Sequence, residues 1–127
     1  MKRLIVFDLD GTLAESKSSL DPEMSGLLHD LLGIVKVAVI SGGNWPQFEK
    51  QLVSALPHDE HLGNLSLLPT CGTKFFQYAD KWNQIYSDGL SADQRATIID
   101  SLKKAVGLAG FHAEKIWARP LKIGEAR

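Results

Sequence analysis

The chain has 127 residues, 44% hydrophobic and 23% charged, which is enough apolar material for one ordinary soluble domain but too little for two. Its 14 basic and 15 acidic residues are mixed along the sequence, so it has no basic stripe and we expect no nucleic-acid partner. No apolar run approaches the roughly 20 residues that span a bilayer, and Asp8 comes too early for a secretory signal. We therefore expect a cytoplasmic location and no membrane partner.

The first part of the chain alternates between expected strands and helices. Residues 4–7 form a continuous apolar run, typical of a strand buried on both faces of a parallel sheet. An Asp-Pro-Glu start at residues 21–23 predicts a helix, and we expect Gly33 to end it in a left-handed conformation. The β-branched run over residues 35–40 predicts a second strand, which completes a βαβ unit.

The alternation continues to about residue 72 and then changes. Apolar spacing predicts a helix over residues 45–56, and residues 65–68 form an expected third strand. Aromatic residues on both sides of residues 79–81 predict a β-hairpin, and Ser91 with Gln94 has the spacing of a capping box before another helix. This order predicts an α/β fold with a doubly wound parallel sheet.

The segment Asp8-Leu9-Asp10-Gly11-Thr12 is the most informative stretch for function. Its two carboxylates directly follow an expected buried strand, at the sheet edge where open α/β folds bind ligands. Asp8 and Asp10 can surround one small hard cation, and Mg²⁺ fits such oxygen ligands. Asp8 can then attack a phosphorus atom, and Asp10 can transfer protons to the leaving alcohol and from water. The alternative is an ordinary polar Asp-Gly turn.

Four further residues are candidates for phosphate binding. Gly11 allows a sharp turn and a close approach to the phosphate, and the Thr12 hydroxyl can donate to it. Ser41 ends the second strand, and Gly42 and its successors bring main-chain N–H groups to the start of the next helix. The alternative for this second segment is a glycine-rich turn with a capping serine.

Two of these segments resemble the motifs of a known superfamily. Residues 6–13 resemble the first motif of the haloacid dehalogenase superfamily, and residues 39–43 resemble its second. The resemblance extends to about Trp117. It implies a Rossmann-like three-layer core with a parallel sheet, with Asp8 as nucleophile and Mg²⁺ ligand. It also implies that Asp10 is the acid/base and offers its main-chain carbonyl to the metal, and that Ser41 binds the phosphoryl group.

The order of elements resembles the members whose α/β cap is inserted after the third strand. Residues 41–45 and 69–73 are most similar to the phosphomannomutase-like branch. By this resemblance, residues 1–72 are the N-terminal part of the core. Residues 73–127 are then the hairpin, the start of the cap and an irregular C-terminal tail.

The resemblance also implies two motifs that the sequence does not show, a third-motif cation and a fourth-motif acidic pair. Charged residues near the C-terminus are interpreted as solvated surface groups rather than substitutes: Glu114, Lys115, Arg119, Lys122 and Glu125. We therefore expect an incomplete core and metal site. A natural truncation, a shifted reading frame or a deliberately shortened chain would each account for this. Residues 4–7 should then form an exposed apolar strand edge that allows self-association.

The sequence leaves three hypotheses for the function. The first is Mg²⁺-dependent hydrolysis of a small phosphorylated metabolite, such as a sugar phosphate, through an aspartyl-phosphate. The second is a sugar phosphomutase reaction. The third is an inactive fragment that acts at most as a binding module.

Two other residue types were weighed as site candidates. The histidines are scattered along the chain, and residues 57–61, with His58 and His61, are interpreted as a polar loop rather than a transition-metal site. Cys71, the single cysteine, is interpreted as a small packed residue.

Overall fold

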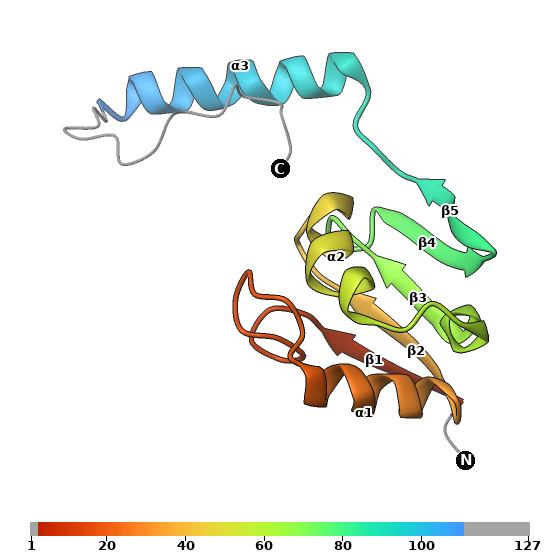
Figure 1. Cartoon of the computed structure of the whole chain (residues 1–127). Coiled ribbons are helices and arrows are strands. Elements are labelled where there is room, and N and C mark those ends of the chain that lie inside the picture. The colour runs from red at the N-terminus through yellow and green to blue at the C-terminus, as the bar shows by residue number, and fades with distance from the viewer. Residues whose placement is uncertain (1–2, 111–127) are drawn as a thin grey trace. The chain divides into compact units, whose positions relative to one another are not determined.

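The computed structural model describes residues 3–110, which form two compact units divided after Asp88, and each unit is described by itself. The first unit contains a five-stranded sheet in the order β1-β2-β3-β4-β5 (Figure 1). The strands are β1 (Leu4–Asp8), β2 (Lys36–Ile40), β3 (Leu65–Leu68), β4 (Lys74–Ala79) and β5 (Lys81–Ser87). β1, β2 and β3 are parallel, as predicted, and β4 and β5 continue the sheet in antiparallel pairing.

Helix α1 (Pro22–Leu32) begins as the sequence predicts. The Asp21 carboxylate accepts a hydrogen bond from the Met24 N–H at 2.7 Å, and Pro22 occupies the first turn. The end of the helix differs from the prediction, because Gly33 has a φ of −69° and is right-handed. The His61 ring packs close to this glycine, since a Cβ at this position would lie 3.4 Å from His61 Cε1.

The core lies on the face of the sheet that α1 and α2 (Trp45–Gln51) cover. Fully buried side chains come from both helices and from the strands beneath them: Leu28, Leu32, Phe48, Val37, Val39, Leu65 and Leu67. The helix predicted over residues 45–56 is shorter than expected. It ends at Gln51 and gives way to two 3₁₀ turns, η1 (Val53–Ala55) and η2 (Glu60–Asn64).

The opposite face of the sheet carries exposed apolar side chains. Leu4 is 51% exposed and Val6 is 56% exposed, whereas Phe7 packs against the core. The prediction that residues 4–7 are buried on both faces is therefore wrong for the described part of the chain, because α1 and α2 cover one face only. β1 stands at one end of the strand order, as expected for an exposed apolar edge.

The hairpin forms where the aromatic pattern predicts it, with a turn at Asp80, whose φ is +63°. Its aromatic residues on the helix-covered face pack on Trp45 of α2. The Phe76 ring stacks on Trp45 at a centroid distance of 4.0 Å, and Trp82 lies 5.7 Å from the same ring. The proposed division between core and cap at residue 72 stays a prediction.

The second unit is described through residue 110 and consists of helix α3 (Ala92–Leu108). It begins with the predicted capping box: Ser91 Oγ accepts from the Gln94 N–H, and the Gln94 side chain accepts from the Ser91 N–H. Among the described helices, none combines the length and the hydrophobicity that a membrane crossing requires.

Candidate active site

The two predicted motifs meet at one edge of the sheet. β1 and β2 are neighbouring parallel strands, and Asp8, the last residue of β1, pairs in register with Ile40, the last residue of β2. Ser41 follows Ile40 directly, so it lies at the same carboxyl edge as Asp8. The structure therefore brings Asp8, Asp10 and Ser41 to one end of the fold, where parallel α/β sheets bind ligands.

A tight loop over residues 9–14 fixes the chain around the second aspartate. Leu9 is completely buried, and its carbonyl accepts hydrogen bonds from the N–H groups of Leu13 and Ala14 at 3.0 and 3.1 Å. Gly11 has a φ of +80°, which suits glycine, and its N–H donates to the Ala14 carbonyl at 2.7 Å. Thr12 is exposed at the outside of this loop. The buried leucine anchors a loop that presents Asp8, Gly11 and Thr12 to solvent.

Asp10 is partly buried and is held by three donors. Its Oδ1 accepts hydrogen bonds from the Lys17 main-chain N–H at 2.9 Å and from Gln51 Nε2 at 3.1 Å. Its Oδ2 accepts one from Gln47 Nε2 at 3.0 Å. The Lys17 N–H, followed by the Gln51 amide, lowers the pKa of the Asp10 carboxyl below its usual value, because these donors stabilise the anion. Asp10 is therefore fixed in position and held in the form that accepts a proton.

Gln47 and Gln51 were not singled out by the sequence analysis. They stand one turn apart on α2, so a helix starting at residue 45 already placed them on a common face. Gln51 is only 1% exposed, and it also donates to the Ser18 carbonyl at 2.6 Å. The signal that could have indicated a role for them is a pair of amides on one face of the helix that follows Ser41.

Gly43 makes room for the Gln47 amide. A Cβ at residue 43 would lie 2.5 Å from Gln47 Cδ and Oε1, closer than real contacts allow. The glycine-rich segment after β2 therefore has a role beyond any contact with phosphate. It lets a side-chain amide reach across to Asp10.

Ser41 is buried, with 8% exposure, and its surroundings are fixed by the backbone. Its carbonyl accepts from the Cys71 N–H at 2.9 Å, and the Gly43 carbonyl accepts from the Thr70 N–H at 2.8 Å. Ser41 Oγ lies 3.4 Å from the Gly43 nitrogen, a long hydrogen bond. Gly42 itself is exposed.

Cys71 differs from its predicted role, since its side chain is exposed rather than packed. It lies in a turn where Thr70, Cys71 and Gly72 all have positive φ values, of +55°, +56° and +81°. A Cβ placed on Gly42 would lie 3.7 Å from Cys71 Sγ. The thiol therefore borders the predicted phosphate-binding segment.

The donor atoms at this edge are suited to a hard divalent cation such as Mg²⁺. The Asp8 carboxylate is exposed, and carboxylate and carbonyl oxygens are the ligands that Mg²⁺ takes in proteins. Both Asp10 carboxylate oxygens already accept hydrogen bonds, so the main-chain carbonyl of Asp10 is the better placed ligand. The C-terminal charges weighed as third- and fourth-motif substitutes lie outside the described residues.

Comparison with known proteins gives sequence relatives of one kind, although no family model matches the chain. Phosphomannomutase 1 of Mus musculus is 37% identical over 49 residues, which are 39% of this chain and 19% of that protein. A probable phosphomannomutase of Caenorhabditis elegans is 29% identical over 106 residues, which are 84% of this chain and 36% of that protein. The chain thus spans about a fifth to about a third of these relatives.

Solved structures agree on the fold. A haloacid dehalogenase-like hydrolase from Bacteroides thetaiotaomicron matches 87% of this chain and 39% of its own, with a TM-score of 0.61 and 22% identity. The C-terminally truncated IMP-nucleotidase of Plasmodium falciparum matches 85% of this chain and 36% of its own, with a TM-score of 0.64 and 16% identity. These likenesses establish the fold alone, whereas the phosphomannomutases match in sequence. The chain therefore has the fold of haloacid dehalogenase-like hydrolases and is similar in sequence to phosphomannomutases.

Proposed function

We propose that the chain carries the nucleophile half of a Mg²⁺-dependent phosphohydrolase that acts on a small phosphorylated metabolite, such as a sugar phosphate. The observation that supports this most directly is the contrast between its two aspartates. Asp8 is exposed at the sheet edge, and Asp10 is fixed beside it by Lys17, Gln47 and Gln51. One free carboxylate and one positioned carboxylate suit a nucleophile and its proton-transfer partner.

The reaction divides into two displacements at phosphorus. In the first, an Asp8 carboxylate oxygen forms a bond to phosphorus while the ester P–O bond breaks, and Asp10, in its protonated form, gives its proton to the departing oxygen. In the second, water attacks the aspartyl-phosphate, gives its proton to Asp10, and releases phosphate and the Asp8 carboxylate. In the second step Asp10 acts as the anion, which is the form that its three hydrogen-bond donors stabilise.

The remaining predicted residues hold the phosphoryl group. The loop at Gly11 and Thr12 and the segment at Ser41 and Gly42 border the same edge of the sheet as Asp8. Mg²⁺ held by the Asp8 carboxylate and the Asp10 carbonyl would neutralise phosphate charge during the attack. We place this reaction in the cytoplasm.

A phosphomutase is the second candidate, and the matched phosphomannomutases favour it. In that reaction the aspartyl-phosphate is passed to a sugar hydroxyl rather than to water. A sugar bisphosphate should then be required as activator, and the isomerised sugar phosphate should form with little free phosphate.

The test is Mg²⁺-dependent turnover of sugar monophosphates by the folded chain and by its Asp8→Asn variant. We expect Asp8→Asn to lower kcat by at least about a thousandfold, since an amide cannot serve as the nucleophile. Asp80→Asn, an exposed change in the β4–β5 turn, is the matched control and should retain activity. Full activity in Asp8→Asn would reject the nucleophile role. A folded chain that neither turns over substrate nor binds Mg²⁺ by calorimetry would instead support the third hypothesis, a binding module at most.

A further inference from the structure

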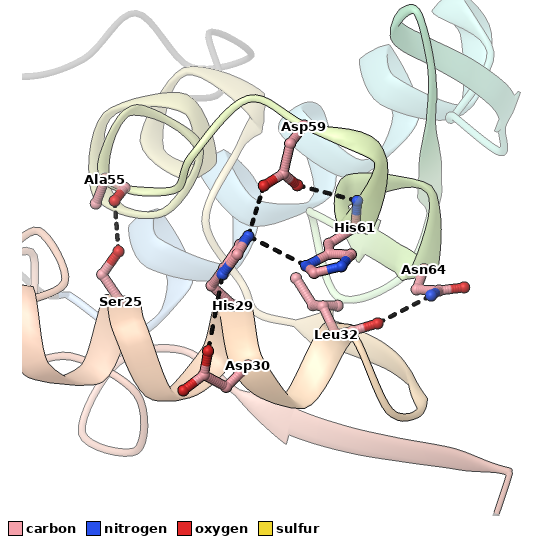
Figure 2. A network of polar contacts seen from close by, with 8 residues as sticks. All are labelled: Ser25, His29, Asp30, Leu32, Ala55, Asp59, His61 and Asn64. Carbon is pink, nitrogen blue, oxygen red and sulfur yellow. Dashed lines mark hydrogen bonds and ion pairs between the residues drawn. The ribbon is translucent and has the colours of Figure 1, made fainter.

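A second cluster of side chains that can bind a ligand lies at the amino ends of the parallel strands. His29 stands in the last turns of α1, and Asp59 and His61 belong to the segment around η2 that leads into β3 (Figure 2). α1 runs back from the carboxyl edge of β1 toward the first residue of β2, and η2 precedes the first residue of β3. The group is therefore at the amino edge of the parallel strands, away from Asp8.

The three side chains converge on one point. His29 Nε2 lies 2.6 Å from Asp59 Oδ2, and His61 Nδ1 lies 3.2 Å from the same His29 nitrogen. One ligand atom from each residue lies within 4.8 Å of the other two. His29 is 30 positions from Asp59 and 32 from His61, so the fold rather than local spacing brings it to the other two.

The two neutral imidazole rings cannot supply a separate hydrogen for each of the two contacts among these three atoms. In the neutral state His29 Nε2 carries at most one hydrogen, which it can direct to Asp59 or share with His61. If His61 Nδ1 also carries a hydrogen, two N–H groups face each other at 3.2 Å. If it does not, Asp59 Oδ2 and His61 Nδ1 both direct a lone pair at the single His29 N–H. A cation in place of that proton can accept a lone pair from all three atoms.

We propose that His29, Asp59 and His61 form a site for a divalent transition-metal ion of the Zn²⁺ class, which ties the η2 segment to α1. Two imidazoles and one carboxylate are a donor set that Zn²⁺ takes, with a fourth position left for water. Bonds of about 2.0–2.1 Å in tetrahedral geometry place ligand atoms about 3.3 Å apart. The 3.2 Å nitrogen–nitrogen distance already matches, and the 2.6 Å contact needs to open by only a fraction of an ångström.

The surroundings of the three ligands are built to orient them. Asp59 Oδ1 accepts from the His61 main-chain N–H at 3.0 Å, which turns Oδ2 toward the histidines. Asp30 Oδ1 lies 4.0 Å from His29 Nδ1, on the ring nitrogen that faces away from the site. Carboxylates near the outer nitrogen of a ligating histidine are common in metal sites.

One further hydrogen bond holds the η2 segment against α1, since Asn64 Nδ2 donates to the Leu32 carbonyl at 2.9 Å. The neighbouring turn η1 is held to the same helix by Ser25 Oγ, which donates to the Ala55 carbonyl. The His61 ring packs beside Gly33, where a Cβ would lie 3.4 Å from its Cε1. The His29 and Asp59 side chains are 22% and 39% exposed, so an ion can enter from solvent. The site is suited to stabilise the fold rather than to join the chemistry at Asp8.

The test is calorimetric titration of the untagged, chelator-treated chain with ZnCl₂ in excess Mg²⁺, paired with thermal unfolding. We expect one Zn²⁺ per chain and a rise in Tm. His29→Ala and His61→Ala should each weaken binding by at least about tenfold, because ligand loss costs no less than loss of an outer partner. The Tm rise should shrink in parallel.

Three variants make the result decisive. His58→Ala removes an exposed neighbouring imidazole outside the cluster, and Asp8→Asn removes a carboxylate of the other site; both should bind Zn²⁺ like the parent chain. Asp59→Asn keeps an oxygen that can accept from the His61 N–H, so it should fold normally yet bind more weakly. Absence of saturable binding would overturn the proposal. So would equal binding by His29→Ala, or a loss of binding in His58→Ala.

Discussion

At the scale of single residues, the two aspartates of the first motif have different environments although they are two positions apart. Asp8 is exposed at the end of β1, whereas Asp10 accepts hydrogen bonds from one main-chain and two side-chain donors. Each bond stabilises the ionised form of Asp10 relative to the acid. The residue that we propose as the acid/base is therefore fixed in place before any substrate binds.

This environment predicts how Asp10 links stability to pH. Because the folded-state pKa is lowered, ionised Asp10 stabilises the fold fully above the unfolded-state pKa of about 3.9. That contribution is lost as the pH falls through the lower folded-state pKa. We expect the gap in unfolding free energy between the parent chain and Asp10→Asn to shrink as the pH drops below about 4.

The measurement is urea unfolding at several pH values between about 2.5 and 7. Asp80→Asn serves as the control, because Asp80 is exposed in the hairpin turn and asparagine tolerates its positive φ. A gap for Asp10→Asn that stays constant with pH would contradict the role assigned to its hydrogen bonds.

At the scale of elements, the segment between β2 and α2 determines how Asp10 is held. Gly43 leaves the space that the Gln47 amide fills, and that amide donates to Asp10 Oδ2 at 3.0 Å. A methyl group at residue 43 would have to displace the end of the Gln47 side chain. The glycine and the glutamine thus act on Asp10 through one contact.

We therefore predict that Gly43→Ala and Gln47→Met have the same effect and are not additive. Each should raise the pKa of Asp10 by removing one donor, and should move the acidic limb of the pH–rate profile upward. The double variant should be no worse than either single variant in kcat. A double-mutant cycle on kcat measures this, and additive losses would show that the two residues act separately.

The sequence predicts most elements of the fold but fewer of their contacts. Strand β3 and helix α1 were predicted with their observed bounds, because apolar periodicity and an Asp-Pro start are local signals. The right-handed Gly33 was missed, because a glycine at a helix end permits a left-handed conformation without requiring it, and here its N–H continues the hydrogen bonding of α1 to the His29 and Asp30 carbonyls. The meeting of His29 with Asp59 and His61 was missed because these side chains come from separate elements. Local patterns carry no information about which distant side chains the fold brings together.

In the candidate site, too, local signals were predicted and contacts between elements were missed. Asp8, Asp10 and Ser41 were predicted because parallel strands end at a common edge, and the structure places them there. Gln47 and Gln51 were missed because amide side chains on a helix carry no chemical signal of their own. Their role depends on α2 crossing next to the Asp10 loop. Packing between elements, rather than composition, selects such residues.

At the scale of the whole unit, one face of the sheet is left apolar. Residues of β1, β2, β3 and the hairpin line a shallow apolar cavity of about 350 Å³ on this face: Leu4, Val6, Ala38, Ile40, Ser66, Leu68, Phe75 and Tyr86. β1 also ends the strand order among the described strands, so its outer edge offers main-chain N–H and carbonyl groups for pairing. Such surfaces favour association between chains.

The last prediction is that copies of the chain associate through β1 and this face. Val6→Lys places a charge at a 56% exposed position of β1 and should lower the apparent mass toward that of one chain. Ile34→Lys makes the same change at an 83% exposed position before β2, outside the cavity lining, and should associate like the parent chain. Sedimentation velocity over a range of concentrations distinguishes the outcomes. Association that is unchanged in Val6→Lys, or lost equally in Ile34→Lys, would assign the contact to another surface. A parent chain that stays monomeric at every concentration would contradict the prediction.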